Sequence, residues 1–331
     1  MLNPDAKLSA EVFTDDIKKA STRDGFGSGI VEVGKVDSRI VVLCADVAES
    51  TRADQFQKEF PERFIEMGVA EQNMAGVAAG MAAAGKIPFI ASYAVFSPGR
   101  NYEHIRTTIA LNQMPVKICG MHAGVSVGPD GATHQMLEDI GMMRMLPNMT
   151  VIAPCDAEEA RKAVIAAVKT DAVYIRFSRA ATPVFTTSET PFQIGKSLLL
   201  WDSDQTAGGP KVAIFSTGSL GYAALTAARS LADEGIESVV LHIPTVKPLD
   251  EEAILDATTR AGRVVTIEEH QIAGGFGSAI AEFLSQNNPV PMRLVGVKDK
   301  FGQSGEPGEL LAHYGFDALH IAEAVRSFVH I

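Results

Sequence analysis

Short apolar runs alternate with longer stretches of helical periodicity along the first half of the chain. The apolar runs lie at residues 40–45, 88–93, 116–120, 150–154 and 173–177. Between them, segments such as 157–169 carry apolar residues at three- and four-residue spacing, which is typical of amphipathic helices. Strand-like runs flanked by helices predict a parallel sheet that is covered on both faces.

A second series of the same kind follows. Its apolar runs lie at residues 211–215, 238–242, 263–267 and 292–296, and helices are expected over 222–234, 251–259, 278–286 and 318–329. Between the two series, residues 180–210 are rich in Thr, Ser, Pro, Gly and Asp, which indicates a linker or a small hairpin. The sequence therefore predicts an α/β protein with two doubly wound, mostly parallel sheet domains, at residues 1–190 and 191–331.

The charge balance excludes two classes of partner. The 331 residues include 29 Lys and Arg against 40 Asp and Glu, a net charge of −11, and the basic residues are scattered. Such a chain has no electrostatic footprint for nucleic acid or for an anionic membrane surface. The most apolar long segment, 68–84, contains Glu71, Gln72 and Asn73 and falls short of the roughly 20 strongly apolar residues of a membrane span. We expect a soluble protein with no nucleic-acid or membrane partner.

Three cysteines, Cys44, Cys119 and Cys155, are widely spaced and form no CxxC pair. Neither a disulfide framework nor a thiolate zinc site is indicated, and no metal site is predicted in this chain. The first residues lack the basic region and apolar stretch of a signal peptide, so a cytoplasmic location is expected. The glycines that begin at Gly274 do not directly leave a strand, and a tight helix entry explains them better than a nucleotide fingerprint.

The first candidate site residue is Glu71, near the start of the Gly- and Ala-rich stretch 68–85. A helix with so little side-chain bulk lets another backbone approach closely, which favours a crowded interface. Glu71 stands in its first turn among apolar residues, where desolvation would favour a shared or donated proton. The alternative is a glutamate that only complements the helix macrodipole.

The second candidate is the glycine-rich segment 122–135, which follows a strand-like run. We expect it to form a long loop at the carboxyl end of a strand, where ligands bind in open parallel sheets. His122, Asp130 and His134 could converge there as acid-base or anion-binding groups, and metal ligation is the rival role.

A third group of candidates is dispersed along the chain. Asp46 and Ser50 follow the end of an apolar run, which favours a site. Arg23 and Arg179, taken singly, are more often surface residues. Spacing alone does not join these four residues.

Two aromatic residues follow another predicted strand. Phe96 and Tyr102 could offer a flat apolar wall to a ring-shaped ligand. A single aromatic side chain is ordinarily part of the core, so both roles stay open.

Taken in chain order, these segments resemble the second half of a transketolase, which comprises a pyrimidine-binding domain and a C-terminal domain. The resemblance runs from about residue 21 to the end of the chain. Its motifs are Ala45-Asp-Val-Ala-Glu-Ser, Gly68-Val-Ala-Glu-Gln-Asn, Gly128-Pro-Asp-Gly-Ala-Thr-His-Gln, Phe177-Ser-Arg and Ile267-Glu-Glu-His. Several ordered motifs over most of the chain are far more specific than any one of them.

The resemblance implies thiamine diphosphate as the cofactor. In that family, a glutamate at the position of Glu71 hydrogen-bonds the aminopyrimidine ring, so that a ring nitrogen can remove the thiazolium proton. Asp46, Val47, Phe96 and Tyr102 fall on other cofactor-binding positions.

The chain departs from the family at one position of the cofactor site. Gly99 stands where transketolases usually carry the phenylalanine that stacks on the pyrimidine. Phe96, Tyr93 and Tyr102 are the candidates for that role.

The resemblance also gives the dispersed candidates a common role. The positions that bind the sugar phosphate correspond here to Arg23, Ser50, His122 and Arg179. Converging arginines could hold such a dianion despite the net negative charge. Asp130 and His134 fall on positions that contact substrate hydroxyls near the reacting carbons, and His122 and His134 are expected to take part in catalysis together with Glu71.

The family's other half is missing from the sequence. That half carries a diphosphate-binding domain with a GDG motif that holds Mg²⁺ and the diphosphate, and no GDG occurs among the 331 residues. The resemblance therefore implies the C-terminal subunit of a split transketolase, whose partner is a separate N-terminal subunit that holds most of the Mg²⁺ coordination. An α2β2 assembly is expected, in which two copies of this chain could pair at the core.

The expected reaction is transfer of a two-carbon ketol unit from a ketose phosphate to an aldose phosphate, as in the pentose phosphate pathway. The alternatives are the β subunit of a 2-oxoacid dehydrogenase, an enzyme similar to 1-deoxy-D-xylulose-5-phosphate synthase, and a non-catalytic structural subunit. The second alternative stays open because that enzyme carries an arginine at the position of Gly99, and Arg100 stands one place later. A buried carboxylate at Glu71 argues against the last alternative, since a purely structural protein gains nothing from it.

Overall fold

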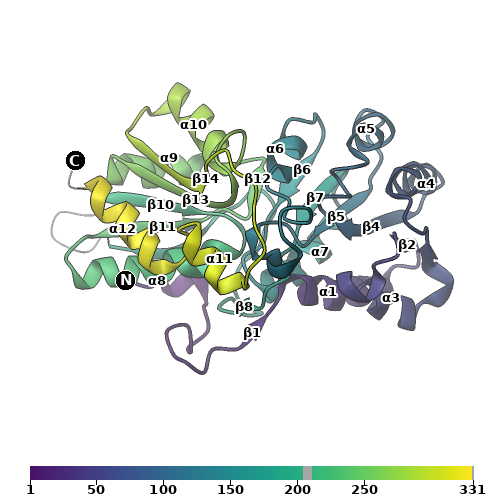
Figure 1. Ribbon diagram of the computed structural model, residues 1–331, viewed down its shortest axis with the longest axis horizontal. Coiled ribbons are helices and arrows are strands. Elements are labelled where there is room, and N and C mark those ends of the chain that lie inside the picture. The colour runs from purple at the N-terminus through teal and green to yellow at the C-terminus, as the bar shows by residue number, and fades with distance from the viewer. Residues whose placement is uncertain (204–210, 330–331) are drawn as a thin grey trace.

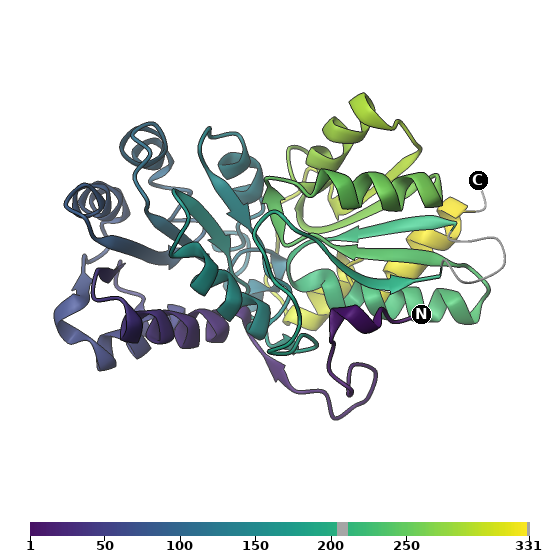
Figure 2. The same cartoon turned by 180° about the vertical axis from the view of Figure 1, so that it is seen from behind.

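The computed structural model describes residues 1–203 and 211–329. Two α/β units lie side by side, one built mainly from the N-terminal half of the chain and one from the C-terminal half (Figure 1). Each unit has a central sheet with helices on both faces, which confirms the predicted fold class (Figure 2). Within the described residues, no helix combines the length and the apolar character needed to cross a membrane.

The first unit is organised around a seven-stranded sheet. In sheet order, its strands are β12 (Thr245–Lys247), β6 (Thr150–Ile152), β7 (Val173–Arg176), β5 (Lys117–Met121), β4 (Ile87–Tyr93), β2 (Ile40–Cys44) and β3 (Phe64–Glu66). Neighbouring strands run parallel except β12, which pairs antiparallel with β6. The apolar runs expected from the sequence form the central strands, whose side chains are almost all buried.

Helices cover both faces of this sheet. One face carries α1 (Thr22–Val36), α3 (Ala53–Glu59) and α7 (Ala157–Ala167). The other carries α4 (Glu71–Ala83), the π-helical turn η3 (Ile105–Ala110) and α6 (Asp139–Arg144) (Figure 1). Shorter helical segments are η1 (Pro4–Ala6), α2 (Ala48–Thr51), η2 (Pro61–Arg63), α5 (Tyr102–His104) and η4 (Val125–Asp130).

The second unit is organised around a five-stranded sheet. In sheet order, its strands are β14 (Met292–Val297), β13 (Val264–Gln271), β10 (Val212–Ser216), β11 (Ser238–His242) and β9 (Leu198–Asp202), all parallel except the edge strand β9. The helices α8 (Gly221–Asp233) and α12 (Ala318–Val329) cover one face, and α9 (Glu251–Ala261) and α10 (Phe276–Asn287) cover the other. The short segments are η5 (Gly218–Leu220) and α11 (Pro307–His313).

The chain crosses between the two units at several points. The strand β12 comes from the C-terminal half but joins the first sheet, and Leu2 near the N-terminus pairs with Trp201 of the second unit. The segment 180–210, expected as a linker or a small hairpin, contains β8 (Thr182–Pro183), which pairs with β1 (Lys19–Ala20), and the edge strand β9. Residues 204–210 of that segment lie outside the described part of the chain. The domain division between residues 190 and 191 stays a prediction.

A buried polar cluster joins the two units. Glu159 of α7 and His242 at the end of β11 form an ion pair, with Oε2 and Nε2 2.9 Å apart. The backbone N–H of Cys155 donates to the same carboxylate oxygen at 2.6 Å. The three side chains are potential metal ligands within 4.8 Å of one another. Because Oε2 of Glu159 already contacts the His242 ring and the backbone N–H of Cys155, the cluster is best explained as an anchor between the two units.

Candidate functional site

Polar side chains gather where the strands of the first sheet end. Asp46 follows β2, Tyr93 ends β4, His122 follows β5 and Arg179 follows β7. These four strands are neighbours in the sheet and run parallel, so their carboxyl ends meet at one edge. The fold thus brings to one edge residues that are far apart in the sequence.

Arg23 reaches this edge from the first turn of α1. Its Nη1 donates a hydrogen bond to the carbonyl oxygen of Ser50 at 2.8 Å and lies 3.3 Å from Nε2 of His122. Within residues 1–203 and 211–329, the Nε of Arg23 has no hydrogen-bond partner. Burial, followed by the positive charge of Arg52, lowers the pKa of Arg23. The surroundings of this guanidinium leave its positive charge poorly compensated, which suits an anionic ligand.

Tyr93 lies at the centre of this cluster. Its hydroxyl oxygen is 2.7 Å from Oγ of Ser50, and its ring packs edge-on against His122 with the centroids 4.3 Å apart. From the sequence, Tyr93 was only a candidate for stacking on the pyrimidine. No local pattern could link it to Ser50, which lies 43 residues away.

His122 is fully buried, with a backbone φ of +59°. Burial, reinforced by the positive charges of Arg23 and Arg179, lowers the pKa of His122 to about 3. The imidazole is therefore neutral near pH 7, and its Nδ1 has no hydrogen-bond partner in the described part of the chain. Of the roles considered for His122, these surroundings favour hydrogen bonding to an anion over proton transfer, which works best with a pKa near the operating pH.

Asp130 and His134 lie on the loop that leads away from His122. Oδ2 of Asp130 is 2.9 Å from Nη1 of Arg179, so these two predicted substrate residues form an ion pair. The ring of His134 faces Tyr93 and Phe96 edge-on, at centroid distances of 5.9 and 5.6 Å. The loop therefore places Asp130 on the arginine side of the site and His134 on its aromatic side.

Glu71 begins α4, and its side chain is only 1% exposed. Its Oε2 accepts a hydrogen bond from Nη1 of Arg100 at 2.7 Å. Its Oε1, by contrast, has no hydrogen-bond partner among the described residues. An unpaired buried acceptor is costly, so a ligand that donates a hydrogen bond there would be stabilised. The pairing with Arg100 could not be predicted from the sequence, because the two residues lie 29 positions apart on different elements.

The aromatic residues separate into two places. Phe96 stacks on Tyr93 with the centroids 6.0 Å apart, and the guanidinium of Arg100 lies over the Phe96 ring at 4.7 Å. The hydroxyl of Tyr102 instead donates to the carbonyl oxygen of Met142 in α6 at 3.1 Å, and its ring packs against the apolar core. Phe96 and Tyr93 are therefore the rings associated with the Glu71–Arg100 pair.

Gly99 has a steric reason to be glycine. A Cβ atom at this position would lie 2.0 Å from the carbonyl oxygen of Val95. A phenylalanine could be placed there only if the backbone took another path. The backbone between β4 and α5 therefore leaves no room for a phenylalanine side chain at residue 99.

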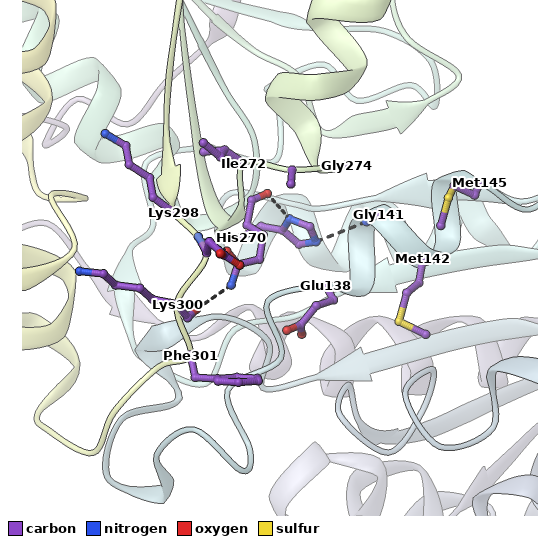
Figure 3. A pocket seen from close by; sticks show the side chains of 13 residues that line it. Glu138, Gly141, Met142, Met145, His270, Ile272, Gly274, Lys298, Lys300 and Phe301 are labelled. Atoms are coloured by element: carbon purple, nitrogen blue, oxygen red, sulfur yellow. Dashed lines mark hydrogen bonds between the residues drawn. The ribbon is translucent and has the colours of Figure 1, made fainter.

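Two hollows lie near the candidate residues. One, of about 590 Å³, is lined by Arg23, Glu66 and residues 46–50 and 52, and so includes the predicted Asp46, Val47 and Ser50. The other, of about 670 Å³, lies between the two units and is lined by α6 and residues 270–274 and 298–301 (Figure 3). Of the predicted site residues, Arg23, Asp46, Val47 and Ser50 line the first hollow, and none lines the second.

Comparison with known protein families matches each of the two units to a family domain. The transketolase pyrimidine-binding domain matches residues 18–184, and the transketolase C-terminal domain matches residues 203–321. The chain therefore belongs to the transketolase family, as its motifs predict.

Individual relatives show which part of a transketolase the chain represents. It is 43% identical over 308 residues to a protein of Methanocaldococcus jannaschii described as a transketolase C-terminal section, covering 92% of this chain and 94% of that one. The transketolase of Homo sapiens is 35% identical over 94% of this chain, but only 49% of the human protein is covered. The solved structure of a split-gene transketolase, described as an inactive β4 tetramer, matches with a TM-score of 0.85 and 42% identity over 94% of this chain and 98% of that one. The chain thus corresponds to the C-terminal subunit of a split transketolase.

Proposed function

We propose that this chain is one subunit of a thiamine diphosphate-dependent transketolase, which transfers a two-carbon ketol unit from a ketose phosphate to an aldose phosphate. The observation that carries the proposal is the carboxylate of Glu71. It is buried, one oxygen is held by Arg100, and the other has no partner in the described residues. That open oxygen suits a ring nitrogen of the cofactor's aminopyrimidine.

The surroundings of Glu71 fit the pyrimidine end of the cofactor. Arg100 fixes the orientation of the carboxylate, so that Oε1 can hold a proton shared with the ring nitrogen. The stacked rings of Phe96 and Tyr93 supply an apolar wall nearby. When bound, thiamine diphosphate would supply a nucleophilic carbon for addition to the ketose carbonyl and an acceptor for the electron pair of the adjacent C–C bond as it breaks.

The cluster around His122 suits the phosphate group of the sugar. Two guanidinium groups, two hydroxyl groups and a neutral imidazole would surround it, from Arg23, Arg179, Ser50, Tyr93 and His122. Charge-assisted hydrogen bonds of this kind are about twice as strong as neutral ones. Asp130 and His134, on the same loop, would contact the sugar hydroxyls near the reacting carbons.

We propose that a separate N-terminal subunit completes the site. It would hold the diphosphate and most of the Mg²⁺ coordination, for which this sequence has no GDG motif. Two comparisons support the proposal: this chain matches only 49% of the human enzyme, and the tetramer of a similar chain is described as inactive. We expect an α2β2 assembly in which two copies of this chain pair at the core.

Replacing Glu71 tests the assignment of the cofactor site. In the complex with the N-terminal subunit, Glu71→Gln should lower kcat for ketol transfer by about 10²–10⁴-fold, the usual contribution of a positioned acid or base. Glu103→Gln is the matched control, because Glu103 lies on α5 with its side chain 71% exposed. A Glu71→Gln complex as active as the control would overturn the assignment.

A further inference from the structure

The motif Ile267-Glu-Glu-His lies at the junction of the two units, near the carboxyl end of β13. Glu268, Glu269 and His270 are all buried there. Glu268 serves its own unit, since its two carboxylate oxygens accept hydrogen bonds from the backbone N–H groups of Phe276 and Gly277 and so cap α10. The other two residues face the first unit.

Glu269 bonds directly to the loop that carries the substrate residues. Its Oε1 accepts a hydrogen bond from the backbone N–H of Ser126 at 2.6 Å, and its Oε2 accepts one from the hydroxyl of Ser219 at 3.2 Å. Ser126 lies in η4, between His122 and His134. A side chain of the C-terminal unit thus fixes a loop of the pyrimidine-binding unit.

The loop is shaped around this carboxylate. Gly124 has a φ of +91°, a conformation that favours glycine, and a Cβ atom there would lie 2.4 Å from Oε1 of Glu269. Gly124 and Glu269 therefore fit together sterically, which a chance contact between the two units would not require.

Neighbouring contacts join the same junction to α6, the helix that follows the loop. Arg176 donates through Nη2 to the carbonyl oxygen of Glu269 at 2.8 Å and through Nε to Oδ2 of Asp139 at 2.8 Å. His270 accepts a hydrogen bond at Nε2 from the backbone N–H of Gly141 at 3.3 Å (Figure 3). The C-terminal unit therefore contacts α6 through His270 and the loop through Glu269.

We propose that Glu269 is a positioning residue for the sugar-phosphate site: its carboxylate fixes the loop 122–134 so that His122, Asp130 and His134 stand where the substrate needs them. The inference rests on the proposed function of that loop. It gives the C-terminal unit a part in substrate binding, although none of the predicted site residues belongs to it.

The chemistry of the contact predicts which substitutions it tolerates. Burial raises the pKa of the Glu269 carboxyl, and in either protonation state one oxygen can accept the Ser126 N–H. Glutamine keeps that oxygen and adds an NH₂ group that can donate to the Ser219 hydroxyl. Alanine removes the acceptor and leaves the Ser126 N–H buried without a partner.

The test compares Glu269→Ala and Glu269→Gln with Glu268→Ala, in complex with the N-terminal subunit. Glu269→Ala should raise KM for the ketose phosphate by about tenfold, with a smaller effect on kcat, because the loop loses its fixed position. Glu269→Gln should restore KM to within about twofold of the wild-type value. Glu268→Ala removes an equally buried carboxylate that does not touch the loop, so its KM should equal that of the wild type. An equal rise in KM for both alanine variants, or for Glu269→Gln and Glu269→Ala, would overturn the proposal.

Hydrogen exchange of the full chain without its partner gives a second readout that does not depend on activity. Peptides covering residues 122–134 should exchange faster in Glu269→Ala than in the wild type, and at the wild-type rate in Glu269→Gln. If Glu269→Ala does not fold, Glu269→Asp replaces it, since the shorter side chain cannot reach Ser126 and should give the same faster exchange. Unchanged exchange would contradict the role of Glu269, whereas a wild-type complex without ketol transfer would contradict the proposed function alone.

Discussion

At the scale of single residues, positive charge concentrates around His122 although the chain has a net charge of −11. The positive charges of Arg23 and Arg179 help to lower the pKa of His122, and the charge of Arg52 helps to lower the pKa of Arg23. Salt screens exposed charges beyond about 8 Å, so an anion at this edge interacts with these arginines rather than with the molecule as a whole. Local geometry therefore matters more than net charge for binding a sugar phosphate.

Tyr93→Phe removes one hydroxyl and keeps the ring that packs on His122. We expect KM for a ketose phosphate to rise about tenfold, because a hydrogen bond to a charged group contributes about 1.5–3 kcal/mol. KM for hydroxypyruvate, a donor without phosphate, should stay unchanged. Steady-state kinetics of the complex with both donors measures the difference. Tyr222→Phe, which removes a hydroxyl bonded to the carbonyl oxygen of Val12, is the control, and an equal change with both donors would count against the phosphate role.

Sequence patterns could predict some site residues and not others. Asp46 and His122 follow buried apolar runs, so their position at the ends of strands follows from periodicity alone. The resemblance to transketolases added the roles of Glu71 and Arg23. The sequence links Arg100 only to an alternative family, because its hydrogen bond to Glu71 joins residues that lie 29 positions apart. Contacts of this kind have no periodic signature.

At the scale of elements, α4 combines a packed face with an open one. Ala75, Ala78 and Ala82 are buried in the apolar core. On the open face, a Cβ atom added at Gly76 or Gly80 would meet nothing within 4 Å. Small side chains there leave room for another subunit to approach closely, as expected for an interface helix.

Val77→Arg tests whether the open face of α4 is an interface. Val77 is 36% exposed, and a long charged side chain there should prevent subunits from packing while leaving the fold intact, because surface substitutions usually change stability by less than about 0.5 kcal/mol. Light scattering should show smaller assemblies, with or without the N-terminal subunit. Val36→Arg, at the end of α1 where Val36 is 83% exposed, is the control. Assemblies of unchanged mass for Val77→Arg would place the interface elsewhere.

Some strands follow from the sequence pattern alone, and others form only through tertiary pairing. A central strand such as β2 follows from its continuous apolar run, because a sheet covered on both faces buries the side chains of its central strands. The strand β12 did not follow from the sequence. It is only Thr245-Val-Lys, and it becomes a strand through its pairing with β6 of the other unit. Tertiary pairing of that kind overrides local propensity.

At the scale of the whole molecule, the two units depend on each other. The strand β12 extends the first sheet, the ion pair between Glu159 and His242 crosses the junction, and Glu269 holds a loop of the first unit. We propose that the residues at the site edge bind the pyrimidine of the cofactor and the sugar phosphate. On this proposal, a second kind of subunit holds the diphosphate and Mg²⁺.

Reconstitution tests this requirement most directly. The purified chain and the N-terminal subunit are assayed separately and together, with thiamine diphosphate and Mg²⁺, for ketol transfer from xylulose 5-phosphate to ribose 5-phosphate. We expect no transfer by either subunit alone and transfer by the mixture. Full activity of this chain alone would contradict it.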